Sequence, residues 1–118
     1  MKINHINMRC SNLETTRQFL ESVALLKVGA RPPITAAGYW LYDDSGTAVV
    51  HLIEAPYALG AAGAVDHVAF FTPQLSTEID RLTALGYLCK PYRVPGTEIS
   101  QLFIDGPDNI QIELQGVL

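Results

Sequence analysis

The chain has little cysteine and no excess of positive charge. Its 118 residues include only two cysteines, Cys10 and Cys89, too few for a disulfide scaffold, so we expect both to remain thiols that pack as small side chains. Eight Lys and Arg against twelve Asp and Glu give a formal net charge of −4 and a pI near 5.2. This acidic balance argues against nucleic acid and against an anionic membrane surface as partners.

Long apolar runs are lacking as well. No segment approaches the roughly 20 apolar residues that a membrane-spanning helix needs, and the N-terminal segment 1–5 is not followed by the apolar stretch and cleavage site of a secretory signal. We therefore expect a cytoplasmic protein. With 48% hydrophobic residues, the chain is long enough for one compact domain with its own core.

What the sequence does contain is an internal repeat with an offset of 62 residues. His5 and His51 are 46 residues apart, and so are His67 and Glu113 (51 − 5 = 113 − 67 = 46). His5 precedes His67 by the same 62 residues that separate His51 from Glu113. Other matched pairs at this offset are Leu13 and Leu75, Leu20 and Leu82, Arg31 and Arg93, Pro33 and Pro95, and Asp43 and Asp105. The register holds without a gap, which indicates two related structural modules.

Hydrophobic periodicity and turn residues predict the same order of elements in both modules. For module 1 (1–55) we expect a strand over 4–9, a helix over 13–25 capped by Ser11 or Asn12, and strands over 27–31, 38–43 and 47–55. For module 2 (64–118) we expect a strand over 65–71, a helix over 75–85, and strands over 87–93, 98–105 and 110–115. Residues 56–63, rich in Ala and Gly, suit a flexible linker. The prediction is an α+β protein of two βαβββ modules.

The repeated His and Glu positions predict a metal centre. His5 and His67 fall on the first strand of their modules, and His51 and Glu113 fall on the last. A single histidine on an apolar strand is more often a core or surface residue than a ligand, but all three histidines of the chain and one carboxylate occupy matched strand pairs. Imidazole and carboxylate are ordinary ligands of divalent metals. We therefore predict His5, His51, His67 and Glu113 as ligands of one divalent ion.

These residues and modules also carry a family resemblance. His5 in INHINMR, His51 in VVHLIE, His67 in VDHVAF and Glu113 in IQIEL, set in paired βαβββ modules, resemble the vicinal oxygen chelate superfamily. That superfamily includes glyoxalase I, methylmalonyl-CoA epimerase, bleomycin-binding and fosfomycin resistance proteins, and extradiol dioxygenases. The resemblance implies a curved, cup-shaped mixed sheet of eight strands, usually completed in a homodimer, around a central Ni, Co, Zn, Mn or Fe ion.

The resemblance also implies a chemistry. Two adjacent positions on the ion would take the vicinal oxygens of a small substrate, and the ion would act on both as a Lewis acid. Three neutral imidazoles and one carboxylate leave the centre with a formal charge of +1, which favours an anionic chelating group such as an enediolate. Glu113 is the candidate catalytic residue, because its counterpart in glyoxalase I moves a proton between adjacent carbons. Glyoxalase I differs in having a glutamate where this chain has His51, and an asparagine where it has Ala55.

We predict a substrate cavity lined by arginine and aromatic side chains. The predicted substrate-binding residues are Arg9, Tyr39, Phe71, Tyr92, Arg93 and Phe103. The leading functional prediction is a lyase or isomerase of glyoxalase type. The alternatives are an extradiol-type dioxygenase, whose iron needs two His and one carboxylate, and a metal-free resistance protein that binds a small molecule.

Overall fold

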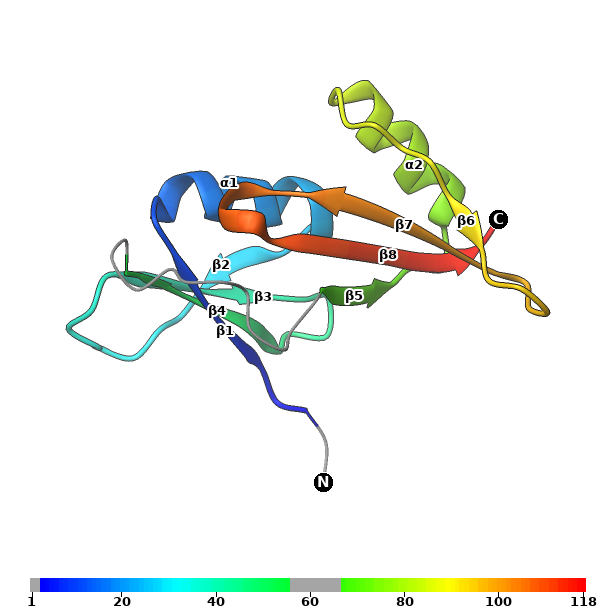
Figure 1. Ribbon diagram of the computed structural model, residues 1–118. Helices are drawn as coiled ribbons and strands as arrows, with labels where there is room; N and C mark the ends of the chain where they lie inside the picture. Colours follow the sequence, from blue (N-terminus) through cyan, green and yellow to red (C-terminus); the bar gives the residue numbers. More distant parts are fainter. Residues whose placement is uncertain (1–2, 56–66) are drawn as a thin grey trace. The chain divides into compact units, whose positions relative to one another are not determined.

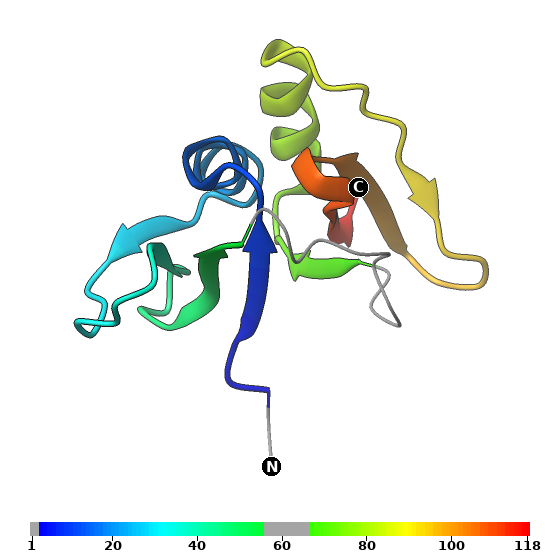
Figure 2. The same ribbon diagram turned by 60° about the vertical axis from the view of Figure 1, so that its left-hand side comes forward.

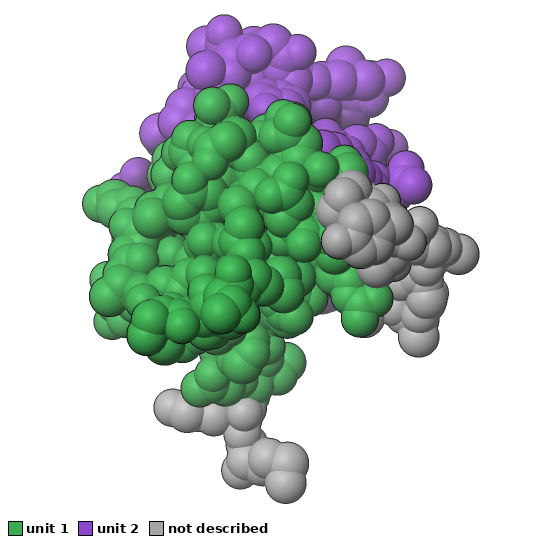
Figure 3. Space-filling view, turned by 90° about the vertical axis from the view of Figure 1, so that its left-hand side faces the viewer, with its two compact units in different colours: residues 1–63 green, residues 64–118 purple. Residues whose placement is uncertain are grey.

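The computed structural model describes residues 3–55 and 67–118. The chain divides into two compact units, Met1–Gly63 and Ala64–Leu118, which Figure 3 shows in different colours. The predicted linker 56–63, and the first two residues of the strand predicted over 65–71, lie outside the described residues. None of the described helices is long and apolar enough to cross a membrane.

Unit 1 has the predicted βαβββ order (Figure 1). Its elements are β1 (Ile6–Cys10), α1 (Leu13–Ala24), β2 (Lys27–Gly29), β3 (Gly38–Tyr42) and β4 (Ala48–Glu54). The strand order is β1-β4-β3-β2, with β1 parallel to β4 and the other pairs antiparallel. Helix α1 lies against one face of this sheet (Figures 1 and 2). Leu20 and Val23 of α1 and Leu41, Val50 and Leu52 of the sheet are almost completely buried and form the core.

Unit 2 repeats this arrangement. Its elements are β5 (Val68–Phe71), α2 (Leu75–Ala84), β6 (Tyr92–Arg93), β7 (Ile99–Asp105), a short 3-10 helix η1 (Pro107–Asn109) and β8 (Gln111–Val117). The strand order is β5-β8-β7-β6, with β5 parallel to β8. Leu75 and Leu82 of α2 are buried, as are Leu102 and Ile112 of the sheet. The predicted α+β fold of two βαβββ modules with eight strands is therefore confirmed.

The 62-residue offset appears in the strand pairing itself. Ile6 pairs with Val50 in unit 1, and Val68 pairs with Ile112 in unit 2, so both parallel pairs have the same register at this offset. The antiparallel hairpins do not. Trp40 lies opposite His51, whereas Phe103 lies opposite Glu113, an offset of 63 residues. The unit 1 hairpin also has a register shift between Leu41 and Tyr42, of the kind that a β-bulge produces, and the β7–β8 hairpin has none among its paired residues.

Local sequence signals explain the ends of the helices. Asn12 caps α1, and its side chain accepts a hydrogen bond from the Thr15 N–H at 3.0 Å, as expected for an Asx residue at this position. Helix α2 ends at Ala84, and Gly86 follows two residues later with a φ of +93°, in the left-handed region that glycine adopts without steric cost.

The strand predicted over 87–93 is much shorter than expected, because only Tyr92 and Arg93 pair with β7. Pro91 precedes this pair, and proline has no N–H to donate to a neighbouring strand. Residues 87–90 therefore pass beside β7 without strand pairing, and a pocket of about 290 Å³ lies there, lined among others by Tyr87, Lys90 and Phe103.

Candidate metal centre

In unit 1, the two predicted ligands lie beside each other. His5 directly precedes β1, and His51 lies in the middle of β4. Their rings are stacked with centroids 3.8 Å apart and an interplanar angle of 16°. Trp40, the cross-strand neighbour of His51, also stacks on it, at 4.0 Å and 5°. The ring of His51 is thus held in one orientation by two aromatic neighbours.

The surroundings of His51 favour its neutral form. Burial and the neighbouring His5 lower the pKa of His51 from its ordinary value of 6.5, and Arg31 acts in the same direction. A hydrogen bond with the Ala48 backbone opposes this effect. Only the neutral imidazole can donate a lone pair to a metal ion, so a lowered pKa keeps this side chain ready to bind at neutral pH.

In unit 2, the other two predicted ligands are in direct contact. His67 directly precedes β5, and Glu113 lies on β8. The Nε2 atom of His67 is 2.9 Å from Oε2 of Glu113. The Nε2 amide of Gln101 donates a hydrogen bond of 2.8 Å to the other carboxylate oxygen, Oε1. The ring of Phe103 meets His67 edge-on at 5.3 Å.

Burial of Glu113 makes this pair distinctive. The residue is only 2% exposed, and carboxylates are rarely so deeply buried unless a charged partner or a metal compensates for lost hydration. Every second residue of β8 points to the same side, so Glu113 shares its face with Gln111 and Gln115, while Ile112 and Leu114 point to the buried side.

The donor atoms of the second pair are spaced to bind one ion. Protein nitrogen and oxygen ligands bind a divalent ion such as zinc at about 2.1 Å, so two ligands at right angles are about 3 Å apart. The separation between His67 Nε2 and Glu113 Oε2 is 2.9 Å. Gln101 holds Oε1 by a hydrogen bond and so orients the carboxylate with its other oxygen, Oε2, next to His67, as supporting residues do in metal sites. These two side chains could therefore supply two of the ligands of a divalent metal.

The four predicted ligands form two pairs, one in each unit. Of the residues that the structure describes, no three His, Cys, Asp or Glu side chains lie together in a group that could hold a metal ion. Each unit supplies two donors at equivalent positions, in front of its first strand and within its last.

The predicted substrate-binding residues are divided between the two faces of their sheets. Phe71, Tyr92 and Phe103 share the Glu113 face, since they pair in register with Gln115, Gln101 and Glu113 respectively. Tyr92 and Phe103 also line the pocket of about 290 Å³. In unit 1, Arg9 pairs with Ile53 and so shares the His51 face.

Two of the predicted residues lie on the opposite face. Tyr39 pairs with Leu52 and its hydroxyl donates a hydrogen bond to Glu14 of α1, which raises the pKa of Tyr39. Arg93 pairs with Ser100 and donates to the Thr97 carbonyl at 2.9 Å. The structure therefore does not bring Tyr39 to the histidines of unit 1, nor Arg93 to Glu113.

Two further contributors were missing from the predicted set of site residues. Gln101 orients Glu113, and Trp40 stacks on His51. Their contacts with the predicted ligands can be recognised only once the hairpin register is known, because that register decides which residues of β3 and β7 share a face with the ligands.

No protein-family model matches the sequence, and a search of curated proteins found no match. Solved structures do match over nearly the whole chain. A possible glyoxalase from Bacillus cereus is 23% identical, with a TM-score of 0.70 and 97% of each chain covered. The fosfomycin resistance protein FosX from Listeria monocytogenes is 19% identical, with a TM-score of 0.76, and the match covers 99% of this chain and 91% of that one.

A third match is an integron cassette protein from the mobile metagenome of the Halifax Harbour sewage outfall. It is 15% identical, with a TM-score of 0.79 and 98% of each chain covered. A mutant of the Listeria protein was solved in complex with Mn(II) and 1S,2S-dihydroxypropylphosphonic acid. The glyoxalase-like and FosX structures belong to the vicinal oxygen chelate superfamily. The paired βαβββ modules and these matches show that the chain has a glyoxalase-like fold.

Proposed function

We propose that the protein is a divalent-metal-dependent enzyme of the vicinal oxygen chelate type, acting as a lyase or isomerase on a small substrate with two adjacent oxygens. His5, His51, His67 and Glu113 would hold one ion. The observation that carries the proposal is the buried Glu113 carboxylate, paired at 2.9 Å with His67. A stacked pair of histidines at the equivalent position of the other module supports it.

When bound, the ion would supply a Lewis acid for both substrate oxygens and stabilise the negative charge of an enediolate, a contribution on the order of several kcal/mol. The protein side chains have their own tasks. Gln101 and His67 hold Glu113 in one orientation. Trp40 and His5 hold the ring of His51.

Glu113 is our candidate for proton transfer between adjacent substrate carbons. A general base must reach the proton it moves within hydrogen-bonding distance. The Oε2 atom of Glu113 contacts the Nε2 atom of His67, while Oε1 accepts a hydrogen bond from Gln101. Release of Oε2 would therefore leave the carboxylate oriented while it accepts and returns a proton.

Elemental analysis of purified protein, with Ni, Co, Zn, Mn and Fe determined after expression in metal-supplemented medium, tests the centre. We expect one divalent ion per four-ligand centre in the wild-type protein and its loss in His67→Ala and in Glu113→Ala. Glu98→Ala, which changes an exposed acidic residue at the other end of the β7 hairpin, is the control and should retain metal. Full occupancy in both ligand variants would contradict the assignment.

Activity assays distinguish a lyase or isomerase from a dioxygenase and from a metal-free binding protein. The metal-loaded protein is incubated with 2-oxoaldehyde adducts, acyl-CoA thioesters and catechols, with and without a chelator, while oxygen uptake is recorded. We expect chelator-sensitive turnover without oxygen uptake. Iron with oxygen uptake on catechols would instead establish a dioxygenase, and small-molecule binding that a chelator does not affect would establish a metal-free binding protein.

We further propose that the centre operates in a homodimer, as the resemblance to the superfamily implies. Sedimentation measures the dimer, and a mixture of two variants tests how its modules pair. If modules pair across the dimer, refolding His51→Ala together with Glu113→Ala should restore one intact set of ligands per mixed dimer. If they pair within a chain, the mixture should bind no more metal than either variant alone.

A further inference from the structure

The edge of β7 that faces β6 is only partly paired. The Ile99 carbonyl accepts a hydrogen bond of 2.8 Å from the Val94 N–H, on the β6 side. In an antiparallel strand the N–H and C=O of one residue point to the same side, and successive residues alternate. Gln101, Phe103 and Asp105 therefore also direct these groups away from β8. Pairing with β6 stops at Gln101, so the main-chain groups of Phe103 and Asp105 lie on an open edge.

A hydrogen bond at the other end of β7 agrees with this assignment. The Gly106 N–H donates to the Ile110 carbonyl at 2.7 Å, so the even-numbered residues of this region face β8. Within residues 3–55 and 67–118, neither Phe103 nor Asp105 has a main-chain partner on the β6 side. Each leaves one strong donor and one strong acceptor available there.

The pocket of about 290 Å³ lies against this open edge. On its other side is the segment 87–91, the yellow trace that leads from α2 to β6 in Figure 2. If the β6–β7 register continued toward α2, Lys90 would lie opposite Phe103 and Leu88 opposite Asp105. All four of these residues line the pocket. The pocket thus takes the place of two main-chain pairs that the chain itself does not form.

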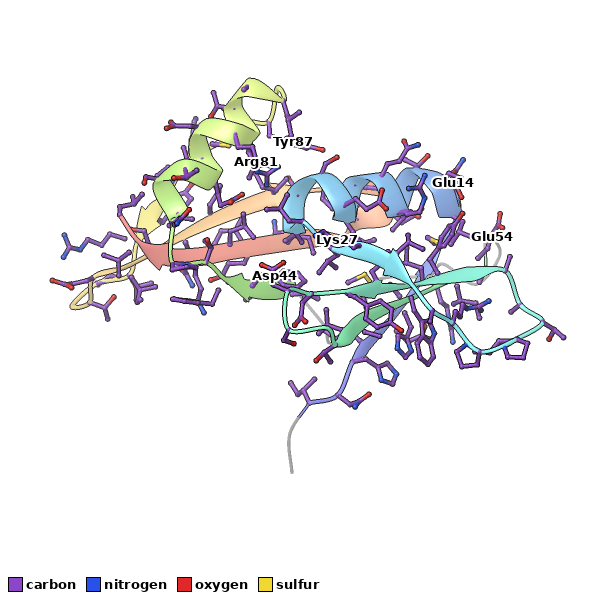
Figure 4. The ribbon with its side chains drawn as sticks, turned by 180° about the vertical axis from the view of Figure 1, so that it is seen from behind. Glu14, Lys27, Asp44, Glu54, Arg81 and Tyr87 are labelled. Carbon is purple, nitrogen blue, oxygen red and sulfur yellow. The ribbon has the colours of Figure 1, made fainter. Side chains whose placement is uncertain are left out.

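Apolar side chains and one free cation surround these main-chain groups. Tyr87, labelled just after α2 in Figure 4, lines the pocket together with Leu88 and Tyr92. Leu88 is 75% exposed and Tyr92 is 61% exposed, which is informative for such large side chains. Lys90 makes no ion pair with any carboxylate that the structure describes. None of the candidate metal ligands lines this pocket.

We propose that this pocket binds a short peptide in an extended conformation, whose main chain pairs with Phe103 and Asp105 and whose carboxylate lies near Lys90. In such complexes the main-chain hydrogen bonds provide affinity, and contacts with the side chains provide selectivity. The volume is at the lower end of the range for ligand pockets. Because β7 bounds the pocket on one side and the segment 87–91 on the other, the occupant is a single chain with both of its edges free. A strand of a second folded copy carries its own sheet and does not fit this space.

NMR titration of isotope-labelled protein tests the proposal, with a chelator present so that metal takes no part. The probe is the tripeptide alanyl-valyl-phenylalanine with a free carboxylate. We expect saturable downfield shifts of the N–H signals of Phe103 and Asp105, and much smaller shifts of those of Leu102 and Ile104, which pair with β8. The same peptide with an N-methylated valine lacks the central donor and should bind about five- to tenfold more weakly.

Leu85 and Leu88 provide a matched pair of exposed leucines. Leu88 lines the pocket, whereas Leu85, which is 56% exposed, does not. Leu88→Asp should weaken peptide binding about fivefold or more, because it removes apolar contact and brings a second carboxylate toward that of the peptide. Leu85→Asp should bind as the wild type does. The wild type should prefer the free acid over the C-terminal amide of the peptide about two- to fivefold, and Lys90→Gln should remove that preference.

Several results would overturn the proposal. Equal shifts at odd-numbered and even-numbered residues of β7, or equal binding of the N-methylated peptide, would exclude main-chain pairing. Absence of any shift at millimolar peptide would exclude the site. Shifts of Phe103 and Asp105 that grow with protein concentration in the absence of peptide would identify a second copy as the occupant instead. Metal content and turnover are measured separately, so each of these failures leaves the proposed function standing.

Discussion

Replacement of Gln101 by leucine tests whether the buried carboxylate is built for a metal. Glu113 is 2% exposed, and its Oε1 atom accepts one hydrogen bond of 2.8 Å, from Gln101. Leucine has a similar size but cannot donate, so one oxygen of a buried charge loses its partner. A hydrogen bond to a charged group contributes about 1.5–3 kcal/mol, and removal of a residue that orients a metal ligand typically weakens metal binding about 10–100-fold.

The assay is a competition titration of the metal against a fluorescent chelator, together with urea unfolding of the metal-free protein. For Gln101→Leu we expect metal affinity to fall about 10–100-fold, equivalent to roughly 1.4–2.7 kcal/mol, and the free energy of unfolding to fall by about 1–3 kcal/mol.

Gln115→Leu is the matched control. Gln115 pairs in register with Gln101 and points to the same face, but its side chain makes no hydrogen bond to Glu113 among the described residues. This variant should bind metal within a factor of about two of the wild type, as expected for a half-exposed residue outside the ligand network. Equal losses in the two variants would mean that the Gln101 contact has no special role, and the view of Glu113 as an oriented ligand would have to be abandoned.

Three further predictions concern stability. The pKa of His51 is lowered in the folded protein, so its contribution to stability should be fully present above its unfolded pKa near 6.5 and should be lost as the pH falls from there through the lower folded pKa. Urea unfolding of metal-free wild type and His51→Gln should therefore differ in acid sensitivity between those two pKa values. Leu20 and Leu82 are fully buried at equivalent positions of the two helices. Replacing either one by alanine should lower the free energy of unfolding, determined by denaturant titration, by about 2–5 kcal/mol. A decrease of less than about 1 kcal/mol would contradict their place in the cores. Gly38→Ala should destabilise β3 and displace Arg31, because the added Cβ would lie 2.1 Å from the Leu52 carbonyl oxygen; an unchanged melting temperature would refute that close approach.

Much of the fold could be predicted from sequence, because two of its signals are local. Alternation of apolar residues identified the buried faces of the strands, and the i, i+3, i+4 spacing identified both helices. The repeat then placed the four ligand candidates at equivalent positions, and the parallel pairs β1–β4 and β5–β8 have the register that the 62-residue offset requires. Asn12 was predicted as a helix cap from its residue type, and it does cap α1.

The middle strands of the two sheets could not be placed from sequence in the same way. The gapless repeat aligns Leu41 with Phe103, but the hairpin register of unit 1 puts Trp40 opposite His51 and leaves Leu41 in the core. A slip of one residue exchanges the two faces of a strand. Tyr39, predicted to line the cavity as an aromatic residue, lies on the other face and is hydrogen-bonded to Glu14. Pro91 has no N–H to donate to a neighbouring strand, so it already indicated that the strand predicted over 87–93 should be shorter.

The amino-acid sequence alone determined the modular repeat, the order of elements and the four candidate ligands, since these depend on spacing along one chain. Only the tertiary structure decided which neighbours those ligands have: Gln101 on Glu113 and Trp40 on His51. Those contacts join residues far apart in sequence and depend on the pairing register of hairpins. Register is set by turns, bulges and packing acting together, and no single stretch of sequence specifies it.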